Sequence, residues 1–219
     1  MKRISLTLCA ATLMLFSCND SSSSSDAKTD GKDSVKSTTT TTDTKMSTDQ
    51  PMDSAAEMKA YMDYATPGTA HAMMAKYTGN WSQEMTMWMK PEDQPVKTTV
   101  TAVTKMLLGG RYQQTIVTGN MMGMPFEGVS TMAYDNAKKM FVNTWMDNMG
   151  SGIMTMEGPW DSTAKSISLK GKCWDPAVGR EIDLREVYTM VDDKTQKFEM
   201  WCTKYGKEFK TMESTMKKK

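Results

Sequence analysis

The sequence predicts an all-β fold: a single antiparallel up-and-down barrel of about ten strands, preceded by one or two short helices. Apolar and polar residues alternate with a period of two through most of the chain after residue 80, which is typical of strands with one buried face. Gly, Pro, Asp and Asn separate these runs at hairpin-like spacing, and no helical pattern lies between them. Closure into a barrel removes both exposed sheet edges; a two-sheet β-sandwich is the alternative.

The expected elements follow one another from Met52 onward. Asp53 or Ser54 can cap a first short helix, and Pro67 can occupy the first turn of a second helix that carries His71. The expected strands are residues 85–89, 100–103, 112–118, 126–134, 140–146, 152–160, 167–173, 182–191, 197–203 and 209–216. Because the connections are short, we expect each strand to pair with its neighbours in sequence.

Residues 1–17 have the pattern of a bacterial signal peptide. Lys2 and Arg3 precede an apolar run, Ile4 to Phe16, that is too short to span a membrane as a helix. The string that ends at Cys18, Leu-Phe-Ser-Cys, resembles a lipobox, which implies cleavage before Cys18 and fatty-acyl chains such as palmitate on it. Asn19, in place of Asp, favours the outer membrane by the same resemblance. An ordinary secreted protein cut near this point is the alternative.

A polar segment, residues 18–51, separates this signal from the predicted barrel domain, residues 52–219. Residues 19–50 contain eight Ser, eight Thr, six Asp and four Lys but no aromatic residue. Such a segment cannot bury enough apolar surface to offset the entropy of ordering. We therefore expect a disordered tether, with a root-mean-square length on the order of 30 Å, between a lipid anchor and the barrel.

Composition and motifs exclude several classes of function. The net charge is +1, from 27 basic and 26 acidic residues, so we expect no nucleic-acid partner. One His, His71, and no Gly-x-Ser-x-Gly string argue against a hydrolase triad, and the His and Cys residues do not have zinc-ligand spacing. Phosphate-binding glycine loops are absent. We expect no enzyme, no cofactor and no metal, although acidic residues on strands leave a glycosidase-like carboxylate pair open.

Several short motifs in a fixed order resemble the bacterial family catalogued as domain of unknown function 1579, over roughly residues 67–217. They are His71 with Lys76-Tyr77-Thr78-Gly79-Asn80-Trp81, Leu108-Gly109-Gly110-Arg111-Tyr112, Met122-Gly123-Met124-Pro125-Phe126-Glu127-Gly128, Tyr134-Asp135-Asn136, Trp145-Met146-Asp147, Asp175-Pro176, Arg185-Glu186-Val187 and Glu208-Phe209-Lys210-Thr211-Met212-Glu213. The resemblance implies a lipocalin-like (calycin) or nitrobindin-like barrel. Nitrobindin-like proteins ligate haem through a late His, and this sequence has none after His71.

We expect the barrel to bind a small apolar or amphipathic ligand. Trp81, Phe126, Trp145 and Arg185 are the predicted lining. Arginine is scarce, at four residues against 23 Lys, and a guanidinium fork suits a carboxylate, so Arg111 or Arg185 could hold an acidic ligand head. Glu127 is a further predicted ligand-binding residue. An internal Arg–Glu pair or an exposed Arg is the alternative for these residues. The rival function is a structural or protein-interaction module whose barrel is filled by its own side chains.

Methionine and cysteine make up the last two observations. There are 25 Met, whereas only four Leu follow residue 18, so we expect Met to fill core positions. A Cu(I) site at Met121-Met122-Gly123-Met124 is the alternative use of these thioethers. Cys173 and Cys202 are either a disulfide or free thiols; a strand is expected between them, which favours free thiols.

Overall fold

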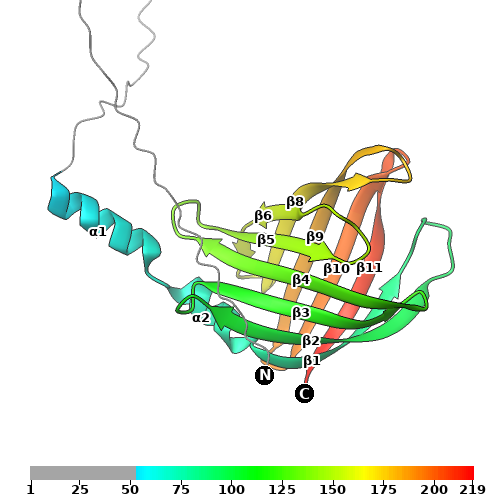
Figure 1. Cartoon of the computed structure of the whole chain (residues 1–219), viewed down its shortest axis with the longest axis horizontal. Helices are drawn as coiled ribbons and strands as arrows, with labels where there is room; N and C mark the ends of the chain where they lie inside the picture. The colour runs from blue at the N-terminus through cyan, green and yellow to red at the C-terminus, as the bar shows by residue number, and fades with distance from the viewer. Residues whose placement is uncertain (1–52) are drawn as a thin grey trace, which may run out of the picture. The chain divides into compact units, whose positions relative to one another are not determined.

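The computed structural model describes residues 53–219, and within them the chain forms one closed antiparallel barrel. The expected signal peptide, Cys18 and the tether lie outside the described residues. Eleven strands follow the order β6-β5-β4-β3-β2-β1-β11-β10-β9-β8-β7, and β6 also pairs with β8. In Figure 1, β2 to β5 form one wall and β9 to β11 the opposite wall. The predicted up-and-down barrel is confirmed, and the β-sandwich does not form.

The strands lie close to the predicted segments. They are β1 (Gly79–Met87), β2 (Val96–Leu107), β3 (Tyr112–Met121), β4 (Met124–Asp135), β5 (Met140–Asp147), β6 (Met154–Gly158), β7 (Trp160–Asp161), β8 (Ser166–Asp175), β9 (Arg180–Asp192), β10 (Thr195–Lys204) and β11 (Lys207–Lys218). The segment predicted as one strand, 152–160, is divided at Pro159, which has no N–H for the ladder. β1 begins at Gly79, six residues before the predicted start at 85.

Two helices precede the barrel in the described part of the chain. α1 (Ser54–Ala65) begins after Asp53, whose carboxylate accepts a hydrogen bond from the Ala55 N–H at 2.7 Å, so the predicted cap is confirmed. α2 (Thr69–Lys76) packs against β2, β3 and β4 at one end of the barrel (Figure 1). Its N-cap is Gly68, so Pro67 lies before the helix and not in its first turn. Neither helix is long and apolar enough to cross a membrane.

Barrel closure depends on a close approach of β6 and β8. The pairing joins Thr155 to Lys172, Met156 to Gly171 and Glu157 to Lys170. A Cβ on Gly158 would lie 1.8 Å from the Ser168 carbonyl oxygen, and one on Gly171 would lie 2.4 Å from that of Thr155. Backbone atoms cannot give way as a side chain can, so both positions require glycine. We call this region, with Gly158 and Gly171, the β6–β8 seam.

Methionine supplies much of the core, as predicted. Met74, Met85, Met121, Met132 and Met156 are all buried, in two clusters that also contain most of the buried aromatic side chains. Met89 belongs to the predicted strand 85–89 but does not share the buried face of Met85. It lies beyond the end of β1 and is 64% exposed.

Candidate functional site

The barrel encloses a cavity of about 340 Å³, which is within the range of small-molecule sites. Twelve of its 29 lining residues are Met. Six aromatic side chains also line it: Tyr77, Trp81, Phe126, Trp145, Tyr188 and Phe198. The cavity extends from Met73 and Met74 of α2 toward Met122 and Met149, which lie in the connections at the opposite end. The barrel is thus not filled by its own side chains, contrary to the premise of the rival function.

Three of the predicted lining residues do line the cavity. The Trp81 indole is buried and donates a hydrogen bond to the Tyr77 carbonyl oxygen at 3.0 Å, which fixes the ring. The rings of Phe126 and Trp145 are stacked, with centroids 6.4 Å apart. Gly128 makes room for Trp145, because a Cβ there would lie 2.4 Å from two atoms of that ring. Their role in ligand binding stays a prediction.

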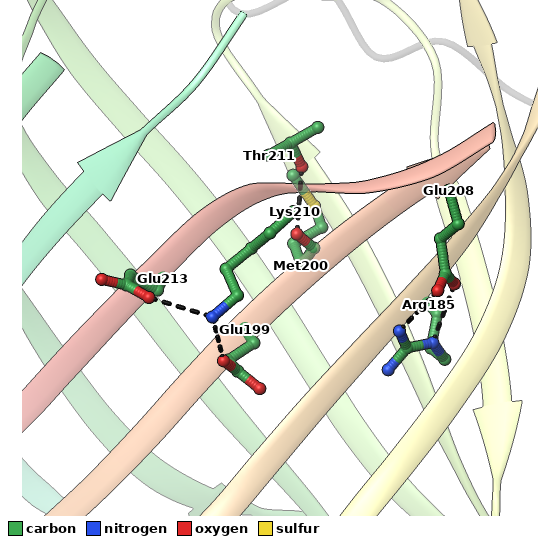
Figure 2. Close-up of polar contacts among 7 residues, drawn as sticks. All are labelled: Arg185, Glu199, Met200, Glu208, Lys210, Thr211 and Glu213. Carbon is green, nitrogen blue, oxygen red and sulfur yellow. Dashed lines mark hydrogen bonds and ion pairs between the residues drawn. The ribbon is translucent and has the colours of Figure 1, made fainter. Parts of the chain in front are cut away.

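Arg185 does not line the cavity, which corrects the sequence prediction. Its Nε and Nη2 atoms donate to the two carboxylate oxygens of Glu208, at 2.9 and 2.8 Å, on the outer face of the barrel (Figure 2). The guanidinium carbon also lies 4.7 Å from the centroid of the Trp201 ring. The hydrogen-bonded Arg185 holds the pKa of Glu208 below its usual range. The arrangement is an Arg–Glu pair, but an outer one.

Glu127 and Arg111 also lie outside the cavity. Glu127 is exposed because it follows the inward-facing Phe126 on β4, and successive side chains of a strand face opposite sides. Arg111 lies just before β3 and donates from Nε to the Ala65 carbonyl oxygen at 2.8 Å, at the end of α1. Asn136 donates to the carbonyl oxygens of Tyr64 and Thr66. Arg111 and Asn136 therefore hold the end of α1 against the barrel rather than a ligand.

A second group of ion pairs lies on the outer face of β10 and β11, in addition to the Arg185–Glu208 pair. Lys210 is paired with Glu199 and, at 3.0 Å, with Glu213 (Figure 2). Both partners raise the pKa of Lys210, the hydrogen bond to Glu199 most strongly. These side chains are partly exposed, so solvent screens the pairs and each contributes little to stability. None of them faces the cavity.

Glu186 is a site residue that the sequence prediction did not single out; it was one of the acidic residues on strands that left a carboxylate pair open. It is 4% exposed and lines the cavity from β9. Its Oε2 accepts hydrogen bonds from the Tyr188 hydroxyl at 3.2 Å and from Asn143 Nδ2 at 3.5 Å, and Ser130 donates to Asn143 Oδ1 at 2.6 Å. Burial raises the pKa of Glu186 to about 7, although these donors oppose the shift. The available signal was the alternation of Ile182, Leu184, Glu186, Tyr188 and Met190.

The other carboxylate oxygen of Glu186, Oε1, accepts no hydrogen bond from residues 53–219 and is not fully enclosed. Since Glu186 lines the cavity, we infer that Oε1 is exposed to the cavity. Oε1 is therefore available to a ligand.

Asp147 is the second carboxylate of the lining. It accepts hydrogen bonds from the Trp145 indole at 2.7 Å and from the Met149 N–H at 2.9 Å. None of the lining residues, all within the described chain, is Lys, Arg or His. The cavity has two acidic groups and no basic one.

The remaining candidates for chemistry are held in structural contacts. The buried His71 accepts a hydrogen bond from the Gly68 N–H at 3.0 Å, and burial, with Arg111, lowers its pKa. Within residues 53–219, no three His, Cys, Asp or Glu side chains gather as metal ligands. Cys173 and Cys202 are free thiols on either side of β9, and burial raises the pKa of both. The disulfide is absent from this structure. Met121 and Met122 line the cavity near its end.

The fold and the cavity define a class: small up-and-down barrels with a ligand-sized interior. The chain belongs to the family described as "Protein of unknown function (DUF1579)", whose model matches residues 66–218.

Two solved structures are similar to this chain. Rv2717c from M. tuberculosis has a TM-score of 0.54 at 12% identity, covering 70% of this chain and 99% of that one, and shows a shared fold. The ywiB protein from Bacillus subtilis, at a TM-score of 0.32 and 8% identity over 64% of this chain and 90% of that one, is too distant to bear on the fold. No curated protein matches the chain.

Proposed function

We propose that this protein binds a small apolar or amphipathic molecule inside its barrel and has no catalytic role. The observation that carries the proposal is the cavity of about 340 Å³, lined chiefly by thioether and aromatic side chains. Such walls favour an apolar ligand through burial, and a few polar groups orient it. In the described residues the single His is held by a backbone hydrogen bond, which supports a binding rather than a catalytic role.

We also propose that the protein works as a lipid-anchored lipoprotein of the cell envelope, at the outer membrane. The support is the sequence pattern alone: a short apolar run, Cys18 and a polar segment of 32 residues before the folded domain. The membrane is then a partner through acyl chains on Cys18, and the barrel takes up its ligand at a distance set by the tether.

Native mass spectrometry tests the binding proposal on protein extracted mildly from native membranes. Ala102 is buried and lines the cavity, whereas its neighbour Val103 is 51% exposed on the outer face. We therefore compare Ala102→Phe, which fills the cavity, with Val103→Phe, which adds a ring outside it. The expected result is a bound small molecule in the wild-type protein and in Val103→Phe, and its loss from Ala102→Phe.

Two results would overturn the proposal. One is a bare mass for the wild-type protein. The other is equal ligand retention in a folded Ala102→Phe variant, with folding checked by near-ultraviolet circular dichroism.

A further inference from the structure

The charge of the cavity decides which amphipathic molecules it suits. Its lining has Glu186 and Asp147 but no Lys, Arg or His. The arginine expected to hold an acidic ligand head, Arg185, is paired with Glu208 outside the barrel. A fatty acid would thus bring a third carboxylate into a space that offers no cation, and like charges at short range repel strongly where solvent is excluded.

The free oxygen of Glu186 is placed to accept from a ligand. Oε2 is held by Tyr188 and Asn143, so the carboxyl group is fixed in orientation while Oε1 opens to the cavity. A carboxylate that is buried with an unused acceptor binds a cation or a strong hydrogen-bond donor well, because electrostatic attraction is stronger in low-dielectric surroundings than in water.

Aromatic faces supply a second attraction for cations. Six rings line the same space as the two carboxylates. Aromatic rings attract ammonium groups, and quaternary ammonium ions in particular, through their negative faces. Anions receive no such benefit.

We infer that the cavity selects cationic amphiphiles, molecules with an apolar chain or ring system and an ammonium or quaternary ammonium group, over fatty acids of the same size. This inference rests on the proposed function, because it names the ligand class of the same cavity. Glu186 takes the ligand cation, and the methionine-rich walls take the apolar part.

Glu186 also makes this selection dependent on pH. The groups that face it are Tyr188 on its own strand, Asn143 from β5, and the apolar Leu169 and Met200 at the paired positions of β8 and β10. Burial raises the pKa of Glu186 to about 7 and that of Tyr188 well above its ordinary value. A cation binds the ionised form of Glu186, so its affinity rises with pH between 6 and 8, by about tenfold for a single site of this pKa.

The test compares three ligands that share one alkyl chain: decyltrimethylammonium, decanol and decanoate, each below its micellar concentration. Binding is followed by calorimetry and by the fluorescence of Trp81 and Trp145, which line the cavity. The quaternary ammonium has no titrating group, so any pH dependence belongs to the protein. Glu186→Gln removes the charge and keeps the shape, and Glu199→Gln is the matched control on the outer face.

At pH 8 we expect decyltrimethylammonium to bind at least tenfold more tightly than decanoate. Glu186→Gln should lower that affinity about tenfold, remove the rise between pH 6 and 8, and leave decanol binding unchanged, while Glu199→Gln behaves as wild type. Binding of decanoate or decanol as tight as that of the ammonium overturns this inference and leaves the proposed function standing. Failure of all three to bind overturns both. Because the three ligands are compared on the wild-type protein, this part of the test stands even if Glu186→Gln does not fold.

Discussion

Glu186 places an ionisable group in an interior that otherwise contains mostly thioether and aromatic side chains. Tyr188 and Asn143 donate to one of its oxygens, and no basic residue of the cavity lining faces it. Desolvation therefore outweighs the hydrogen bonds and raises the pKa of Glu186 to about 7, so the folded protein favours the neutral acid below that pH.

The first prediction is that Glu186→Gln changes how the free energy of unfolding depends on pH. The unfolded chain loses this proton near pH 4.5, and the folded protein retains it to about pH 7. The protonated Glu186 therefore contributes fully to the wild-type free energy of unfolding below pH 4.5. This contribution falls as the pH rises from 4.5 to 7. The loss of this contribution between pH 4.5 and pH 7 amounts to about 3 kcal/mol. The variant should gain that amount over wild type between pH 4 and pH 8, measured by urea unfolding.

Glu199→Gln is the control for this experiment, because Glu199 lies in an outer ion pair with Lys210. A stability difference between wild type and Glu186→Gln that is the same at both pH values would show that the carboxyl group is not held neutral by the fold.

Single residues also show where sequence reasoning stopped. The period of two correctly placed Phe126 and Trp145 in the interior, because each lies in a predicted strand with alternating apolar residues, whereas Trp81 lies before the first predicted strand, so the alternation did not reach it. On β9 the same alternation places Glu186 inside and Arg185 outside. Arg185 was nevertheless predicted to line the cavity, because arginine is scarce in the sequence. The role of Arg111 could not be assigned from the residues around it, since its partner, the Ala65 carbonyl oxygen, belongs to a helix 46 residues away.

At the scale of elements, the β6–β8 seam is the part of the barrel least tolerant of change. We predict that Gly158→Ala lowers the free energy of unfolding by about 2 kcal/mol or more, because the new methyl group would meet the Ser168 carbonyl oxygen and force the two strands apart. Thermal and urea unfolding measure the effect.

Gly152→Ala is the matched control, because a Cβ at Gly152 has open space and its φ lies outside the left-handed region that favours glycine. The control should stay within about 0.5 kcal/mol of wild type. Equal stability of the two variants would contradict the close approach at the seam.

Most elements were predictable because strand alternation and turn residues are local signals. The departures have local or tertiary causes. Pro159 divides β6 from β7, and β1 starts directly after α2 because Trp81 packs into the core beneath Tyr77. A register shift between β10 and β11 at Met200 and Trp201 leaves Thr211 without a partner across the ladder, where its hydroxyl donates to the Met200 carbonyl oxygen (Figure 2). No pattern in the sequence marks that bulge.

At the scale of the whole molecule, the proposed lipid anchor makes a direct prediction. Metabolic labelling with palmitate in a bacterial host should label the full chain, and Cys18→Ser should abolish the label because the acylated thiol is gone. Cys9→Ser is the matched control, since Cys9 lies within the apolar run of the expected signal and should leave labelling unchanged. Label that persists in Cys18→Ser, or that is absent from wild type, would rule the anchor out.

The closed barrel itself followed from the number of strands and their short connections, but its interior did not. Whether this barrel is filled or hollow depends on the summed volume of side chains from every strand except β7, together with α2, which no single segment reveals. The acidic character of the cavity likewise emerges only once Glu186 of β9 and Asp147 of β5 share one lining.

The abundance of methionine around that interior has a consequence for ligand choice. Each thioether side chain is unbranched and has three rotatable bonds, so it can change rotamer at small cost. The hydrogen-bonded backbone of the barrel is rigid, whereas the twelve methionine side chains that line the cavity can adapt their conformations. One barrel can thereby accommodate ligands of different shapes, while the fixed carboxyl group of Glu186 still determines the orientation in which they bind.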